Sequence, residues 1–275
     1  MATDGPQQLT FWERDRQQVT VAFDGGRVVT DAGVFSLHLL DKQLGVLSTI
    51  AQRLPDPRTQ KRVTHTCEAL LTQEVYQILA GYPDGNDAQQ LRNDPLFQTL
   101  VDVPPDAEQP LASGSTLNRF HHAYTRRQAE LSLERGDGRG IYHGFYVQRG
   151  AVPEKPIGEL KNGLRMDRLS FHRFRANGLK LLEHTLAYAL VVLHREAVAA
   201  VAEVVHAEVG TLRQRLWKVG AVVKTSVRRI WFHLSETWPH RHLFVQVYQA
   251  VCSFVAKLHG EPSVVLPGAN LLPLQ

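Results

Sequence analysis

Cysteine is almost absent from this chain, because Cys67 and Cys252 are the only two among 275 residues. They lie far apart and without the short spacing of a metal-ligand pair. The sequence therefore excludes a disulfide-rich secreted domain and a cysteine zinc module. We expect both side chains to be small buried thiols in a reducing cytosol.

Long apolar runs are missing as well, since no stretch of about 20 apolar residues occurs that would cross a bilayer. The polar segment from Met1 to Trp12 lacks the basic-then-apolar pattern of a signal peptide. The sequence thus predicts a cytoplasmic protein without a membrane partner. Its 43% hydrophobic and 21% charged residues are typical of a globular protein of one large or two ordinary domains.

Positive charge is scarce in the first half of the chain and abundant in the second. Residues 146–257 contain 17 Lys and Arg against 8 Asp and Glu, whereas residues 1–145 contain 14 against 18. Such an asymmetry favours a polyanionic partner for the second half. Helices with solvated arginine faces are the alternative.

The local patterns predict a mainly α fold with minor β structure. Residues 18–23 and 27–30 flank the turn signal Asp24-Gly25-Gly26 and predict a β-hairpin. Asp31 is placed to cap the helix that follows. Predicted helices cover 32–54, 64–79, 84–94, 117–134, 173–204, 211–218 and 240–258, and one or two strands fall within 219–234.

These elements suggest a division of the chain. An N-terminal helical domain with the β-hairpin, and with a DNA-binding role, is expected over residues 1–135. A Gly-rich linker covers 136–145, a second part covers 146–260, and a flexible Pro/Gly tail covers 261–275.

The most informative chemical signal is the spacing of Tyr146, Arg149, Glu154 and Lys161. Phosphodiester cleavage and strand transfer use two Mg²⁺ ions about 4 Å apart, held by carboxylates. Glu154 is a natural member of such a set, and Arg149 can bind phosphate in a bidentate manner. Lys161 falls on the same helix face as Glu154 if the segment is α-helical. Solvated surface charges are the alternative.

The surrounding sequence resembles the end of the catalytic core of DDE-class insertion-sequence transposases, which reads Y-x-x-R-G…E-x-x-I-K-E-L-K-x-G-L-x-x-D-R…H-R-F-x-A-N. Further similar segments are 29–33, 81–87, 91–95, 115–120 and 218–229, so the resemblance covers nearly the whole chain. It implies an RNase H-like core, Mg²⁺ as cofactor, transposon-end DNA as partner, and location at the bacterial nucleoid when DNA is bound. The family signature then falls on Tyr146, Arg149, Glu154 and Lys161, with Glu154 as the last metal-binding acid.

The chain departs from the family pattern in its middle. The family carries a long RNase H-like segment with two catalytic aspartates between the S-T-L-x-R-F helix and the Y-x-x-R motif. Here only residues 121–145 separate Phe120 from Tyr146, and Asp137 is the one aspartate among them. The sequence therefore predicts an internal deletion of the catalytic core, which leaves a truncated RNase H-like remnant followed by C-terminal helices.

A smaller departure is the gap of four residues between Arg149 and Glu154, where the family has three. A lone Glu154 carboxylate does not hold two Mg²⁺ ions against water, so we predict a catalytically incomplete protein that does not bind Mg²⁺ stably. The alternative is that Asp31 or Asp137 replaces a missing acid, although Asp31 fits better as a helix cap and Asp137 as a turn residue.

Basic residues in several segments are expected to contact DNA phosphates, which gives salt-sensitive and weakly sequence-specific binding. Lys180 is grouped with the arginines just before it, and Trp231 and Phe232 follow the last cluster. The candidate DNA-binding residues are Asn118, Arg119, Arg126, Arg127, Arg165, Arg168, Arg173, Arg175, Lys224, Arg228 and Arg229.

Histidine pairs such as His121-His122 lack a zinc-ligand pattern and are predicted to project to different sides of a helix. Three hypotheses remain. The chain is a DNA-binding remnant of a transposase, or a non-enzymatic protein that binds transposon ends or full-length transposase and acts as an inhibitor, or a non-functional remnant that folds poorly. A second copy of the chain is a further candidate partner.

Overall fold

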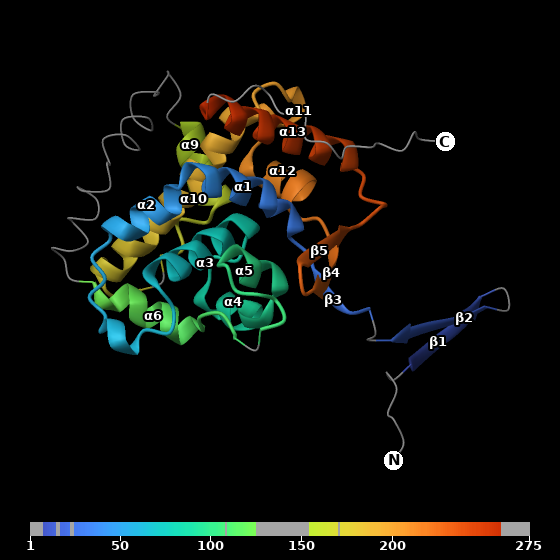
Figure 1. Ribbon diagram of the computed structural model, residues 1–275, viewed down its shortest axis with the longest axis horizontal. Coiled ribbons are helices and arrows are strands. Elements are labelled where there is room, and N and C mark those ends of the chain that lie inside the picture. Colours follow the sequence, from blue (N-terminus) through green and yellow to red (C-terminus); the bar gives the residue numbers. More distant parts are fainter. Residues whose placement is uncertain are drawn as a thin grey trace, which may run out of the picture.

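The computed structural model describes residues 8–14, 17–22, 25–107, 109–124, 154–169 and 171–259. The side chains of residues 8–22, 60, 154 and 155 lie outside this description. Within it the fold is mainly helical, with a two-stranded ribbon and a three-stranded antiparallel sheet. In Figure 1 the three-stranded sheet lies at one end of the helical body, and the ribbon projects away from it.

The helical body is built around α10 (Phe174–Ala197), whose near-continuous Leu, Ala and Val residues are buried on most sides. It packs against α3 (Cys67–Ala80), α6 (Gly114–Ala123), α1 (Phe35–Leu44) and α13 (Arg241–Leu258). Segments before and after the predicted linker therefore share one hydrophobic core. The division into domains stays a prediction.

The remaining helices are short and connect these five. They are α2 (Val46–Arg53), α4 (Gly85–Gln90), α5 (Pro95–Leu100), α9 (Glu154–Gly158), α11 (Ala202–Val205) and α12 (Val209–Leu212). 3₁₀ turns lie at Ala32–Val34, Gln60–Arg62 and Leu91–Asn93, and π turns extend α9 over Glu159–Gly163 and α12 over Arg213–Trp217.

An N-terminal hairpin is present, and both predicted strand segments are strands, but the predicted pairing between them was wrong. β1 (Gln8–Arg14) pairs with β2 (Gln17–Ala22), whereas β3 (Arg27–Val29) pairs with β4 (Ala221–Ser226), far along the chain. β4 in turn pairs with β5 (Arg229–Leu234), which confirms the strands expected in 219–234. The β3–β4 pairing buries Val29 against Ala221. The turn signal at residues 24–26 is local, so it could not show the stability gained by burying Val29 against a strand far along the chain.

The predicted helix over 32–54 is divided at Gly45, which adopts a left-handed backbone (φ 64°). The Asp41 carboxylate accepts a hydrogen bond from the Leu47 amide at 3.0 Å and so helps to begin α2. The predicted Asp31 cap was wrong, because no hydrogen bond from the first turn reaches its side chain. Helix α3 ends at Gly81 (φ 98°), as expected for a left-handed C-cap.

Candidate functional site

The chain that follows Glu154 is fixed to α10 by a buried ion pair. Glu159 accepts hydrogen bonds from both Nη atoms of Arg195, at 2.9 and 2.6 Å, and from the Tyr188 hydroxyl at 3.0 Å. Burial and the adjacent Glu159 carboxylate raise the pKa of Tyr188 to about 12. Arg195 also donates to the carbonyl of Ala207. One bidentate contact thus connects the π turn, α10 and the segment before α12.

The four signature residues are only partly within the described chain. Lys161 is exposed on the π turn. Glu154 is the first residue of α9, with its side chain outside the description, and Tyr146 and Arg149 lie outside the described residues. Because a π turn contains more residues than an α turn, seven positions here do not correspond to two straight α turns.

A second ionic contact connects the two halves of the chain at Asp31, which is 2% exposed. Its carboxylate lies 3.1 Å from the Lys218 ammonium and accepts the hydroxyls of Tyr82 at 3.0 Å and Thr30 at 2.6 Å. Lys218 also lies 4.9 Å from the centre of the Tyr82 ring. The negative charge of Asp31 is therefore balanced by Lys218, a residue that is distant in the sequence but close in space.

Close backbone packing accompanies this contact. A Cβ atom on Gly33 would lie 1.7 Å from the carbonyl oxygen of Leu216. Only glycine therefore lets the first 3₁₀ turn pack this closely against the end of the second π turn. The Ala32 amide donates to the Val219 carbonyl at 3.1 Å. The sequence segments 29–33, 81–82 and 218–221 thus meet in space.

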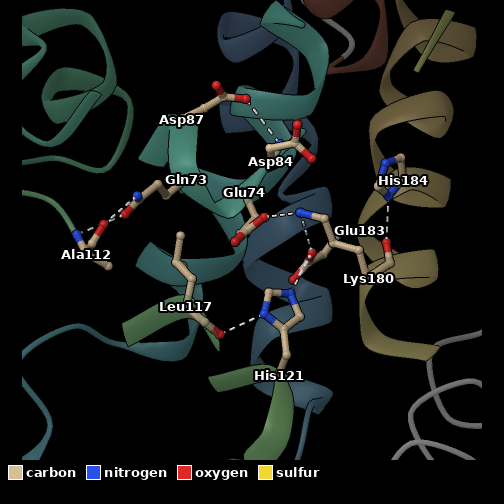
Figure 2. A network of polar contacts seen from close by, with 10 residues as sticks. All are labelled: Gln73, Glu74, Asp84, Asp87, Ala112, Leu117, His121, Lys180, Glu183 and His184. Atoms are coloured by element: carbon tan, nitrogen blue, oxygen red, sulfur yellow. Dashed lines mark hydrogen bonds and ion pairs between the residues drawn. The ribbon is translucent and has the colours of Figure 1, made fainter. Parts of the chain in front are cut away.

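Four ionisable side chains form a buried ionic quartet at the centre of the helical body: Glu74 on α3, His121 on α6, and Lys180 and Glu183 on α10. Figure 2 shows the Lys180 ammonium reaching both carboxylates, while His121 reaches Glu183 from the other side. The contacts to Glu183 are 3.5 Å from Lys180 and 3.0 Å from His121. The quartet connects three helices that pack together in the core.

Opposite charges are matched within the quartet. Burial alone would lower the pKa of His121, but the adjacent Glu183 carboxylate raises it. Burial likewise opposes ionisation of Glu183, yet His121 and Lys180 lower its pKa. The other ring nitrogen of His121 contacts the Leu117 carbonyl at 2.7 Å. With His121 protonated, two anions face two cations.

The quartet was also considered as a metal site. One potential ligand atom from each of Glu74, His121 and Glu183 lies within 4.8 Å of the others. The Lys180 ammonium, however, already lies against both carboxylates. A cation position is therefore filled by the protein itself.

Basic residues gather where α6 meets the start of α10. Phe171 lies 4.9 Å from the ring of His121 and 5.4 Å from that of His122, which brings the two helix ends together. Burial and the positive charges of Arg173 and Arg175 lower the pKa of His122. Four predicted DNA-binding residues of this region are exposed: Asn118, Arg119, Arg173 and Arg175. Arg165 and Arg168, which follow the first π turn in the chain, are exposed as well.

A second basic group lies on the β4–β5 hairpin, where Lys224, Arg228 and Arg229 are all exposed. The Arg229 guanidinium lies 5.5 Å from the centre of the Trp231 ring. Arg126 and Arg127, the other two predicted contacts, lie outside the described residues.

The chain matches the model of a known family in two segments. The family is described as transposase DDE domain group 1, and the matches cover residues 11–133 and 130–255. The chain belongs to this family. No curated protein and no solved structure matches it.

Membership in the transposase family implies DNA binding, and the family typically uses Mg²⁺. The buried carboxylates of the described residues do not fit a Mg²⁺ pair. Asp31 faces Lys218, Glu159 faces Arg195, and the two glutamates of the quartet face Lys180. Asp41 contacts a backbone amide instead. Of the helices described for this transposase-family chain, none is long and apolar enough to cross a membrane.

Sequence patterns missed the ionic contacts that hold this transposase-family fold together. Lys180 was grouped with exposed arginines and predicted to contact DNA, which is wrong because its side chain is buried in the quartet. The position of Lys180 in the sequence could have indicated that it is buried. Lys180 and Glu183 are charged residues within a nearly apolar helix, and buried charges require partners. His121 is buried and His122 is half-buried, and both rings contact Phe171.

Proposed function

We propose that this chain is a DNA-binding transposase remnant that has lost the middle of its catalytic core by internal deletion. The observation that carries the proposal is the position of the two family matches, which meet at residues 130–133. That point lies between the S-T-L-N-R-F helix and the Y-x-x-R motif, where the chain is too short for the family's RNase H-like segment.

In this proposal Glu154 is the remaining family acid, and Tyr146, Arg149 and Lys161 are its phosphate-binding companions. The two aspartates that would complete a Mg²⁺ site belong to the lost segment. The part that follows Tyr146 is then the truncated end of an RNase H-like domain. The ionic partners of the buried acids support this view, because Asp31, Glu159 and Glu74 each already lie against a cation of the protein.

DNA is bound by phosphate contacts from the two exposed basic groups. Such contacts need solvent-accessible cations that are not already neutralised. No ion pair between these candidates and an acid is found in the described part of the chain. The proposed contacts are Asn118, Arg119, Arg126, Arg127, Arg165, Arg168, Arg173, Arg175, Lys224, Arg228 and Arg229.

Two measurements on the full chain test the proposal. Binding to duplex DNA that carries the element's own ends should weaken steeply as salt rises. Incubation with Mg²⁺ should leave the same DNA uncut. Cleavage that Glu154→Gln abolishes would show that the site is complete. An affinity that does not change across the salt series would contradict the proposed phosphate contacts.

A second candidate function is association with full-length transposase as an inhibitor. The observation in its favour is Phe174, a large apolar side chain that is 87% exposed at the start of α10. Co-purification with intact transposase that is lost in Phe174→Ser, in the absence of DNA, would favour this function over direct DNA binding.

A further inference from the structure

The three-stranded sheet has one face toward the core and one toward solvent. Ala221 and Val223 of β4 are buried on the inner face, and Phe232 of β5 contacts Phe35 of α1 with ring centres 4.6 Å apart. Because side chains alternate along a strand, the neighbours of Phe232 point outward. Trp231 is accordingly 48% exposed, and His233 is exposed beside it.

The outward aromatic side chains stack against each other. The rings of Trp231 and His233 are inclined by only 17°, with their centres 6.0 Å apart. Across the strand pair, Lys224 lies directly opposite Trp231, and the Arg229 guanidinium lies over the same indole. An exposed π surface is thus flanked by two cations.

The electrostatics of this surface have one sign. Residues 221–234 include Lys224, Arg228 and Arg229 but no Asp or Glu. In the described chain no acid lies within ion-pair distance of these three side chains. The positive charge therefore stays available to a polyanion.

The exposed Trp231 ring and the neighbouring cations favour single-stranded over double-stranded nucleic acid. Bases inside a duplex are stacked on each other and do not offer their faces to a tryptophan. An unpaired base does, and aromatic side chains next to backbone-binding cations are the usual platform for single strands. An apolar protein partner would match the indole but would leave three cations without counter-charges.

We propose that the outer face of β4 and β5 binds single-stranded DNA, with an unpaired base stacked on Trp231 and phosphates held by Lys224, Arg228 and Arg229. The inference rests on the proposed DNA-binding function and deepens it. Duplex contacts are assigned to the α6–α10 basic group, and the hairpin receives a strand whose bases are exposed.

The test compares one labelled oligonucleotide of about 15 bases, within the span that such platforms cover, as a single strand and as a duplex. Fluorescence anisotropy with the full chain should show that Trp231→Ala weakens single-strand binding by about 5- to 150-fold, as expected for one lost stacking contact of about 1–3 kcal/mol. Duplex affinity should stay unchanged. Trp231→Phe should retain most single-strand affinity.

Tyr248→Ala is the matched control, because Tyr248 is an exposed aromatic residue on α13 (43% exposed) that lies outside the sheet. It should leave both affinities unchanged. Equal single-strand affinity of the unmodified protein and Trp231→Ala overturns the inference, as does an equal loss on both DNA forms. Absent duplex binding with intact, Trp231-dependent single-strand binding would instead overturn the proposed duplex contacts alone.

Discussion

The quartet on α3, α6 and α10 and the outer face of the β4–β5 hairpin use charge in opposite ways. In the quartet each cation lies against a carboxylate, and Glu183 is fully buried. On the hairpin the cations are exposed and belong to a segment without acids. A charge whose partners are present within the fold contributes to stability. A charge without them is available to a ligand.

This difference separates the effects of substitution. Removing one partner from a buried ion pair leaves an uncompensated charge in a low-dielectric interior. Removing an exposed cation changes little in the fold, because water screens it. Variants in the quartet should therefore alter unfolding, and variants on the hairpin should alter binding.

The largest effect is expected for Lys180→Met. The substitution keeps much of the side-chain volume but leaves Glu74 and Glu183 without their shared ammonium. The free energy of unfolding should fall by about 3–5 kcal/mol, as for other broken buried pairs. Urea denaturation followed by circular dichroism measures it.

Lys224→Met on the hairpin is the matched control and should change stability by less than about 0.5 kcal/mol. Adding Glu74→Gln to Lys180→Met should recover part of the lost stability, since it removes one of the two buried carboxylates left without a counter-charge. Similar small losses at both lysines would mean that the quartet is not a buried unit.

The pH dependence of unfolding should distinguish the histidines. Burial, and secondarily Arg195, lower the pKa of His194 to about 4. Its folded pKa lies below the unfolded value of about 6.5, so its contribution is present above pH 6.5 and is lost as pH falls toward 4. Between pH 7.5 and 4.5 the unmodified protein should lose about 2–3 kcal/mol relative to His194→Leu.

His121 should behave in the opposite direction, because the Glu183 carboxylate raises its pKa. Its contribution is present below the unfolded pKa and is lost as pH rises through the folded value. The comparison uses variants because Asp41 and Asp94, whose pKa values burial raises to about 6, offset the contribution of His194 and add to that of His121 in the unmodified protein. Equal pH slopes for the unmodified protein and His194→Leu would contradict the assignment.

Two glycines give a smaller contrast. A Cβ at Gly33 would overlap the Leu216 carbonyl, whereas a Cβ at Gly178 on α10 meets nothing within 4 Å. Gly33→Ala should reduce unfolding free energy by about 1–3 kcal/mol through overpacking. Gly178→Ala should raise it by about 0.5–1 kcal/mol, because alanine favours the helix. Thermal melts of both variants measure these changes in stability. A Gly33→Ala variant as stable as the unmodified protein would mean that the first 3₁₀ turn and the second π turn can move apart.

Sequence patterns were sufficient for elements defined by their own residues. Periodicity predicted α3, α10 and α13, and β-branched residues predicted the strands within 219–234. The break at Gly45 was missed because leucines continue across it. Pairing of β3 with β4 was missed because the gain arises from burying Val29 against a strand nearly two hundred positions away.

The candidate site was less accessible to such reasoning. Lys180 and Glu74 are separated by 106 residues, and no local rule selects one distant carboxylate as the partner of a given lysine. The exposed cations were predictable, because charge clustering is a property of the sequence itself. The function of Asp31 depended on Lys218, so its predicted cap failed for the same reason as the strand pairing.

A small stability change and the clearest binding change are expected for Arg228→Ala combined with Arg229→Ala. Both side chains are exposed, so unfolding free energy should change by less than about 1 kcal/mol for the pair. If each contacts one phosphate of a bound single strand, the slope of log affinity against log salt should become shallower by roughly 0.7 per lost contact. Trp231→Ala should lower affinity without altering that slope, because a stacked base releases no counterion. A salt slope that all three substitutions leave unchanged would show that the hairpin does not contact the DNA backbone, and the basic group at α6 and α10 would then carry the binding alone.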